Sequence, residues 1–472
     1  MSDRFSSKTS CLLLTCLIFV SNLTSTTFAQ GENPYANIEK AYQQGDFDQV
    51  IKLSDGYLAK DPALETPLYF RASAKIEKGI RAADVELVRA GIADARGAIE
   101  KMKTPQPNYY LPYLYGMNHL TLLENSPEHA TTSVTVIDSL FKQLTLTPDQ
   151  KANFLFQRGQ AHLYLDKLPD AEQDFRNALT QVPTHLGAMM SLADALAAQQ
   201  KYQDADNLYS DAIRATPNSP LGYNNRGMFR QSIDRHDEAI KDFEKAVSLD
   251  KNYFVAITNA GFSKLEQSKL ADAEKDFTSS LKIQAQQPGV YSLRGTTRLR
   301  MGKFDDAIKD YEEVIKYTPD SGVAKTDLAF AYYFKKNFAQ AAVVFDEALK
   351  LEPQLTHLMP WRYASKILSN KGQEAEADIA TVVAKPEADR KWVDYLTLYL
   401  SGRVPEDVLL AQVQKEQQEF RQSLLCDANY FIGLRKSNKG DTAGAQKAFN
   451  NALATGEVRL SSYRGSELAL GK

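Results

Sequence analysis

Six alanines stand 34 residues apart, and this spacing constrains the fold more than any other feature of the sequence. An aromatic residue follows each alanine by four positions, and a glycine or alanine precedes each by twelve. Self-similarity at a fixed period of this length is typical of a solenoid, in which each unit packs only on its neighbours. The alanines are Ala171, Ala205, Ala239, Ala273, Ala307 and Ala341, and the aromatics are Phe175, Tyr209, Phe243, Phe277, Tyr311 and Phe345.

Each unit contains two segments with helical periodicity, and neither is apolar over enough of its surface to fold alone. The two segments must therefore pack on each other. A glycine inside a helix costs about 1 kcal/mol relative to alanine. Its recurrence, as at Gly227 and Gly261, predicts that the paired helices approach too closely for larger side chains. The aromatic residue is expected to fill the gap toward the neighbouring unit. An acidic residue just before the central alanine complements the dipole of the second helix.

Small residues, Tyr or Phe, and a closing proline recur at fixed offsets, and this pattern resembles the tetratricopeptide repeat (TPR) family, in its exported bacterial type. The resemblance covers residues 152–355 as six regular units. It also covers a later unit at 426–456, where Gly433, Ala445 and Phe449 fall at the same offsets. It implies an all-α fold, a right-handed superhelical solenoid of antiparallel helix pairs.

The repeat register degrades outside this block. Residues 30–151 are interpreted as divergent N-terminal helical repeats, and residues 356–425 as irregular helical pairs. Within the first of these regions, residues 104–115 contain three prolines and four tyrosines, which predict a loop between two stacks. Residues 426–472 form the C-terminal TPR-like unit and a capping helix around 461–470.

The first 29 residues are predicted to be a signal peptide. Two basic residues precede an apolar run at 11–20, and Thr27 and Ala29 supply the small residues of a cleavage site. The mature chain is therefore expected to begin near Gln30. A lipid anchor on Cys16 is the alternative. No later segment reaches the ~20 uncharged residues that span a bilayer. We expect the protein to be exported to the periplasm, with secretion as the alternative.

Candidate reactive groups are few. Only Cys426 remains after removal of the signal peptide, so no internal disulfide can form. We expect it to be a small buried hydrophobe; an intermolecular bridge or a reactive thiol is the alternative. The six histidines have no metal-ligand spacing, and neither a glycine-rich phosphate loop nor a Gly-x-Ser-x-Gly elbow occurs. The 56 Lys and Arg against 59 Asp and Glu argue against a nucleic-acid partner. We predict no enzyme activity, no cofactor and no metal site.

The TPR resemblance also implies a binding surface, because the first helices of such stacks line a concave groove. Asn225 and Asn259 occupy equivalent places there in adjacent units. An amide can both donate to and accept from the backbone of an extended peptide, and Met228 and Phe262 would add adaptable apolar contact. The predicted peptide-binding residues are Asn224, Asn225, Met228, Thr258, Asn259, Phe262 and Thr296.

Uncharged residues stand where relatives that grip a C-terminal carboxylate carry Lys or Arg, so such a clamp is not expected. The sequence therefore favours a non-enzymatic scaffold or adaptor of the bacterial cell envelope that binds a protein or peptide in its groove. Two alternatives remain. One is a self-assembling structural solenoid, such as a homodimer, and the other is a non-catalytic subunit of an envelope enzyme complex.

Overall fold

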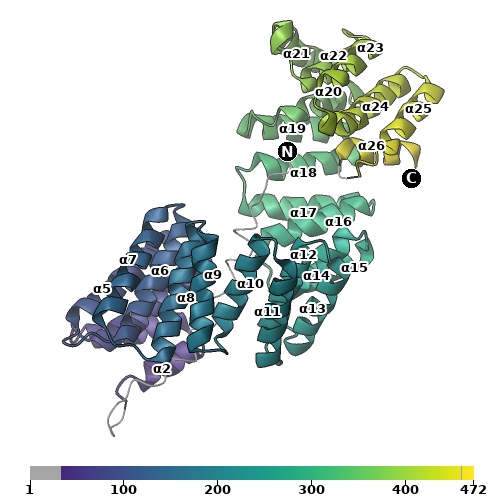
Figure 1. Cartoon of the computed structure of the whole chain (residues 1–472). Coiled ribbons are helices and arrows are strands. Elements are labelled where there is room, and N and C mark those ends of the chain that lie inside the picture. Colours follow the sequence, from purple (N-terminus) through teal and green to yellow (C-terminus); the bar gives the residue numbers. More distant parts are fainter. Residues whose placement is uncertain (1–32, 459, 472) are drawn as a thin grey trace. The chain divides into compact units, whose positions relative to one another are not determined.

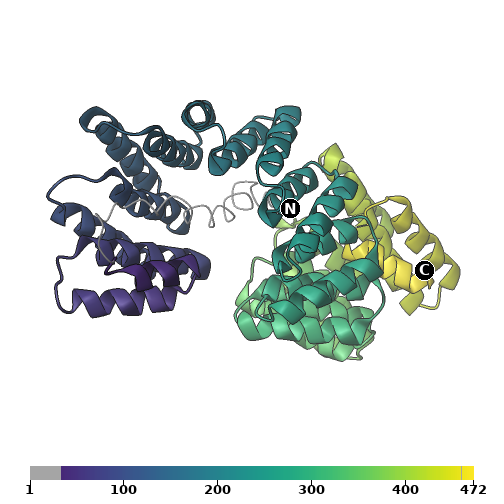
Figure 2. The same cartoon turned by 90° about the horizontal axis from the view of Figure 1, so that it is seen from below.

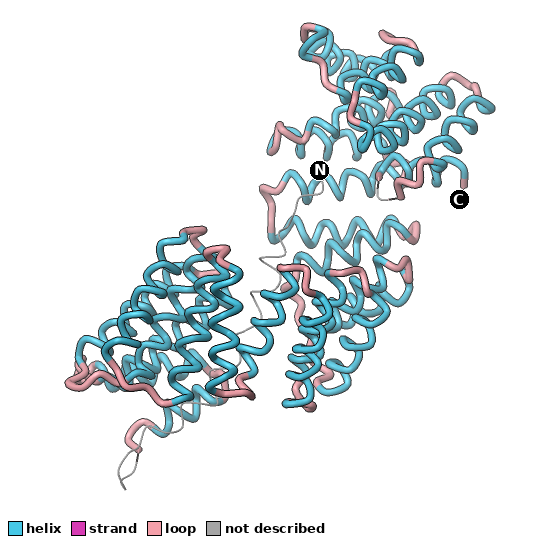
Figure 3. Tube along the Cα trace, viewed as in Figure 1, coloured by secondary structure: helices cyan, strands magenta, loops and turns pink. Residues whose placement is uncertain are grey.

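The computed structural model describes residues 33–458 and 460–471. This part of the chain contains α-helices and short 3-10 helices and no β-strand (Figures 1 and 3), which confirms the all-α prediction. The chain divides into two compact units, Met1–Tyr253 and Phe254–Lys472. The predicted signal peptide, its cleavage site and Cys16 lie outside the described residues.

The first unit is a solenoid of antiparallel helix pairs, which follow one another in sequence order (Figure 2). Its helices are α2 (Ala36–Gln43), α3 (Phe47–Leu58), α4 (Glu65–Ala82), α5 (Val85–Lys101), η3 (Pro107–Tyr109), α6 (Tyr110–Leu123), α7 (Pro127–Gln143), α8 (Pro148–Tyr164), α9 (Leu168–Gln181), α10 (Leu186–Ala198), α11 (Tyr202–Ala215), α12 (Pro220–Ser232) and α13 (His236–Leu249).

The second unit continues the same kind of pairing and ends in a single helix, α26, which packs against α24 and α25. Its helices are α14 (Phe254–Glu266), α15 (Leu270–Ile283), α16 (Pro288–Arg300), α17 (Phe304–Tyr317), α18 (Gly322–Phe334), α19 (Phe338–Leu351), η4 (Thr356–Leu358), α20 (Met359–Leu368), α21 (Gly372–Val383), η5 (Glu387–Asp389), α22 (Trp392–Ser401), α23 (Glu406–Lys415), η6 (Gln418–Phe420), α24 (Arg421–Asn438), α25 (Thr442–Ala454) and α26 (Ser461–Leu470).

The expected loop at 104–115 is only partly a loop, because α6 already begins at Tyr110. Pro112 lies in the first turn of this helix, where the missing backbone N–H would have no intrahelical partner anyway. Tyr113 and Leu114 are buried, so the segment gains apolar burial as a helix. Helix α24 likewise begins at Arg421, upstream of the predicted start of the late unit at Cys426.

The recurrent small residues lie where the paired helices approach most closely. Ala239 of α13 is fully buried. A Cβ added to Gly227 of α12 would lie 2.6 Å from Cε1 of Phe243, so the aromatic ring occupies the space that a larger side chain would need. The aromatic also faces the next pair, as expected, since Tyr209 stacks on Phe229 with ring centroids 5.5 Å apart.

The turn inside each of the six regular pairs, and inside the pair α20 and α21 that follows them, contains one residue with positive φ, always at the same repeat position. The N–H of the residue after it donates to a carbonyl five residues upstream, as in Lys201 to Leu196 at 2.9 Å, which is the Schellman ending of a helix. Glycine fits this conformation best, but only one of these positions is a glycine. The residues are Asp166, Gln200, Asp234, Ser268, Gly302, Lys336 and Asn370.

An ion-pair network connects the second helices of neighbouring pairs, and the repeat pattern did not predict it. Arg226 of α12 binds the carboxylate of Asp242 on α13, with Nη2 2.7 Å from Oδ1, and its Nη1 donates to Ser210 on α11 at 2.9 Å. Asp242 is buried. The same arrangement recurs in alternate pairs, where the arginine and aspartate are Arg158 and Asp174, Arg294 and Asp310, and Arg362 and Asp378.

Candidate functional site

The first helices of successive pairs contact one another, and they form the inner face of each stack. In the first unit these contacts join α4 to α6, α6 to α8, α8 to α10 and α10 to α12. In the second unit they join α14 to α16, α20 to α22 and α22 to α24. The second helices make fewer such contacts with one another, which means that they lie on the outer, wider side of the stack. The predicted peptide-binding residues are on first helices.

In the first unit the predicted residues lie on α12, and they differ in accessibility. Asn224 is fully buried, and its Nδ2 is 3.4 Å from Sδ of Met228. It is therefore not part of the accessible inner surface, contrary to the sequence prediction. Asn225 and Met228 are partly exposed, and Nδ2 of Asn225 is 3.2 Å from Sδ of Met190 on α10. The amide of Asn225 thus joins two adjacent first helices.

In the second unit two predicted residues turn toward the second helix of their own pair. The hydroxyl of Thr258 on α14 is 2.7 Å from that of Ser280 on α15. The hydroxyl of Thr296 on α16 is 3.2 Å from that of Tyr311 on α17. Both threonines thus contribute to packing within a pair, which the sequence prediction did not anticipate. Asn259 is partly exposed.

Phe262 of α14 is also partly exposed, and it packs against the cluster that contains Leu265 and Phe277. The seven predicted residues are divided between the two units. Whether any of them binds a peptide remains a prediction.

Buried polar side chains connect the inner-face helices of the first unit. Nδ2 of Asn118 on α6 donates to the carbonyl of Gln157 on α8 at 2.9 Å, and Nε2 of Gln160 donates to Ser191 on α10 at 2.6 Å. Glu77 on α4 is almost fully buried, and burial raises its pKa to about 7. The hydrogen bonds of Asn118 and Gln160 hold α6, α8 and α10 relative to one another, because breaking either would leave a further buried polar atom without a partner.

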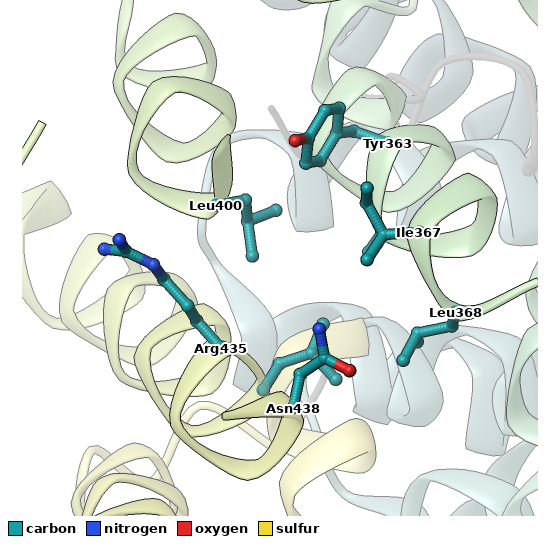
Figure 4. A pocket seen from close by; sticks show the side chains of 8 residues that line it. Tyr363, Ile367, Leu368, Leu400, Arg435 and Asn438 are labelled. Carbon is teal, nitrogen blue, oxygen red and sulfur yellow. The ribbon is translucent and has the colours of Figure 1, made fainter. Parts of the chain in front are cut away.

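A hollow lies on the inner face of the second unit, where α20, α22 and α24 meet (Figure 4). It has an empty volume of about 290 Å³, which includes space open to solvent. Sequence reasoning missed this site because its walls come from the irregular pairs, which have no repeat register to align. Its lining residues are Tyr363, Ala364, Ile367, Leu368, Leu400, Leu434, Arg435 and Asn438.

The described residues hold no cluster of three or more His, Cys, Asp or Glu side chains suited to a metal ion. Cys426 is fully buried in α24, as predicted, and burial raises the pKa of its thiol. Since the thiolate is the reactive form, this shift lowers its reactivity. None of the helices in the described ranges is both long and apolar enough to cross a bilayer.

The tetratricopeptide repeat family matches this sequence at residues 156–220, 222–253 and 298–358. The first two segments run from the middle of α8 through α13, and the third runs from the last turn of α16 through α19 and the segment that follows. The chain is a tetratricopeptide repeat protein. TPR proteins act as scaffolds for interactions between proteins, and the antiparallel pairs with tightly packed small residues agree with this assignment.

Two curated TPR proteins are similar to this one over short segments. The small glutamine-rich tetratricopeptide repeat-containing protein 2 of Saccharomyces cerevisiae is 39% identical over 57 residues, which cover 12% of this chain and 16% of the relative. DnaJ homolog subfamily C member 7 of Homo sapiens is 31% identical over 121 residues, covering 22% of this chain and 24% of the relative. This TPR protein therefore spans less than a quarter of the length of these relatives.

Among solved structures, PilF of Pseudomonas aeruginosa is 21% identical and covers 44% of this chain and 94% of its own, with a TM-score of 0.38. MamA is 23% identical and covers 34% of this chain and 95% of its own, with a TM-score of 0.33. These likenesses are too weak to indicate a function.

Proposed function

We propose that this TPR protein is a non-enzymatic scaffold or adaptor of the bacterial cell envelope, which binds a protein or peptide partner on the inner face of its helix stacks. The observation that carries the proposal is the row of contacting first helices, on which partly exposed amide and apolar side chains such as Asn225 and Met228 lie together. Such a surface offers hydrogen bonds to an extended backbone and adaptable apolar contact.

The envelope assignment rests on the predicted signal peptide at residues 1–29. Mass spectrometry of the protein isolated from cells is expected to give an N-terminus at Gln30 or within a few residues of it. A chain that begins at Cys16 and carries lipid mass would instead support a membrane-anchored protein. A chain that retains Met1 would contradict export.

Site-specific photo-crosslinking tests the inner face. A crosslinking amino acid in place of Met228 on α12 is expected to capture a partner in the native envelope. The same amino acid in place of Lys241, an exposed residue of the outer helix α13, should capture little. Equal capture at the two positions would contradict the proposal. A crosslinked product made only of this chain would instead favour the self-assembling solenoid.

A further inference from the structure

We propose that helix α26 occupies a helix-binding site on the inner face of the second unit, and that a helix of a partner protein with similar chemistry displaces it. This inference rests on the proposed function, because it assigns a site and a kind of partner to the inner face. The helices that form the site, α16, α18 and α24, all belong to the second unit.

Helix α26 lies against first helices, which form the inner face. It packs on α24 and α25, which precede it in the chain, and also on α18 (Figure 1). In addition, Nη2 of Arg464 donates to the carbonyl of Arg300 at the end of α16, at 3.1 Å. A helix that only capped the last pair would contact α24 and α25 alone. The contacts with α16 and α18 place α26 over part of the inner face.

The ring of Tyr430 on α24 forms the floor of the site. A methyl group added to Gly465 of α26 would lie 2.8 Å from Cζ of this ring, so a residue larger than glycine does not fit. The ring also stacks on Trp361 with centroids 4.9 Å apart, and its hydroxyl lies 2.8 Å from that of Tyr333 on α18. Since these contacts do not involve α26, the floor is preformed, and a ligand that binds there loses less ordering entropy.

Two polar contacts complete the site. The hydroxyl of Ser462 donates to Oδ1 of Asp427 on α24 at 2.6 Å. Arg464 places its cation at the carboxyl end of α16, where the helix dipole favours positive charge, and Glu467 of α26 holds the guanidinium at 2.9 Å. The site thus selects a helix that carries a hydroxyl group and a glycine three positions apart, with a basic residue between them.

The apolar contacts of α26 are few enough for a ligand to replace them. Its buried residues are Ser462, Gly465 and Ser466, whereas Leu468 and Leu470 are only partly buried. Burial of large apolar side chains is the main force that holds a short helix in place. Helix α26 therefore gains little free energy from docking.

Docking also places two polar groups in unfavourable surroundings. Burial raises the pKa of Asp427 to about 6, so at neutral pH α26 covers an ionised carboxylate. Nε of Arg464 is buried and, among the described residues, has no hydrogen-bond partner. Both groups cost free energy in the docked state. We therefore expect α26 to open at a lower free energy than the rest of the unit.

Cys426 provides a reporter for the release of α26. It is fully buried in α24, and its Sγ lies 3.5 Å from the hydroxyl of Ser462. It is also the only cysteine after residue 29, so the mature protein needs no other change. The rate at which a thiol reagent modifies the native protein therefore follows the release of α26.

The substitution Gly465→Leu tests the site in the mature protein, because the new side chain would collide with Tyr430. Cys426 should then be modified about five- to a hundredfold faster than in the parent. Ala469→Leu adds the same group on the exposed side of α26 and should leave the rate unchanged. Arg464→Glu places a negative charge at the carboxyl end of α16 without adding bulk, and it should also accelerate modification.

A synthetic peptide with the sequence of residues 460–471 serves as the partner helix. In fluorescence polarisation, the labelled peptide should bind Gly465→Leu at least about tenfold more tightly than the parent, whose own α26 competes at a high effective concentration. The peptide should also protect Cys426 of this variant from modification. A peptide that itself carries Gly465→Leu should bind neither protein, which controls for binding elsewhere.

Several outcomes would overturn the proposal. They are equal modification of Cys426 in the parent and in both destabilised variants, equal binding of the native peptide to the parent and to Gly465→Leu, or binding of the changed peptide as tight as that of the native one. If circular dichroism shows that neither Gly465→Leu nor Arg464→Glu folds, α26 is part of the core and the proposal is wrong.

Two further results separate this site from other interactions of the chain. A dimer of the purified parent that dissociates in Gly465→Leu would make α26 of a second copy the occupant, and it would overturn the proposal as well. If crosslinking at Met228 on α12 still captures a partner, the proposed function stands even though this inference fails.

Discussion

The close approach of the paired helices can be tested at one glycine. Gly227 lies inside α12, and a methyl group there would lie 2.6, 2.8 and 3.0 Å from three ring carbons of Phe243. Carbon atoms in favourable contact are about 3.5–4.0 Å apart, so the overlap is close to 1 Å. The ring cannot withdraw easily because Phe243 is fully buried. Overpacking of this kind costs about 1–3 kcal/mol.

The substitution Gly227→Ala also gains about 1 kcal/mol of helix propensity, which hides part of the clash. Gly97, inside α5 of the same unit, provides the matched control because its added methyl group would lie 3.9 Å from the nearest atom, in Leu68. Gly97→Ala should therefore stabilise the protein by up to about 1 kcal/mol. The free energies of unfolding of the two variants should differ by about 1–3 kcal/mol, since the propensity gain is common to both.

Urea unfolding followed by circular dichroism measures this difference. Phe243→Leu provides a second check, because removing the ring should make Gly227→Ala less costly and give a coupling energy of at least about 0.5 kcal/mol in a double-mutant cycle. If Gly227→Ala proves as stable as Gly97→Ala, the helices are not packed as closely as the structure places them, and the reason given for the small residues is wrong.

Three further outcomes are expected in the same assay. Burial raises the pKa of Glu77 from 4.5 to about 7. Between pH 4.5 and pH 7 the folded state therefore binds more protons than the unfolded state, so the free energy of unfolding should fall as pH rises through this range. Glu77→Gln should then exceed the parent by about 3 kcal/mol at pH 8 and differ little at pH 4. Asp310→Asn removes a buried carboxylate that pairs with Arg294 and Arg298 at 2.7 and 2.8 Å, and it should cost about 3 kcal/mol. Ala239→Leu should cost about 1–3 kcal/mol, and an unchanged free energy of unfolding would contradict the repeat register.

The helix pairs were predictable because their signal is local and is repeated six times. A small residue and an aromatic at fixed offsets have one structural cause, which is the contact seen between Gly227 and Phe243. The left-handed turn position was not predictable in the same way, since the residues there share no side-chain property. The Schellman ending of the first helix sets this position. Backbone hydrogen bonds define the ending, and because they need no particular side chain, the position holds different residue types from pair to pair.

The groove residues were only partly predictable, because the side of a helix that a residue faces depends on a rotation of 100° per position. Asn224 and Asn225 are neighbours, yet Asn224 is fully buried and Asn225 is partly exposed. Thr258 is equivalent to Asn224 in the next unit, and its hydroxyl contacts the second helix of its own pair. Asn224 and Thr258 each stand one position before an inner-face residue. A prediction that is wrong by one position along the helix thus selects residues that pack inside the helix pair. The hollow at α20, α22 and α24 had no repeat register to indicate it.

The Arg and Asp network shows that neighbouring units are not interchangeable. At the positions of Arg294 and Asp310, the following unit carries Leu328 and Val344, which are buried in one hydrophobic cluster. Leu192 and the residue 16 positions after it, Leu208, likewise share a cluster. In these two units both members change together, from ionic to apolar. The remaining intervening unit carries Ala260 and Asp276 at these positions, and Asp276 pairs with Lys264 at 2.8 Å. If α8 paired with α11 in place of α9, Arg158 would face Leu208 instead of Asp174. An unpaired charge at such a buried site costs several kcal/mol, so at these positions the alternation favours the native pairing of first and second helices over a pairing shifted by one unit.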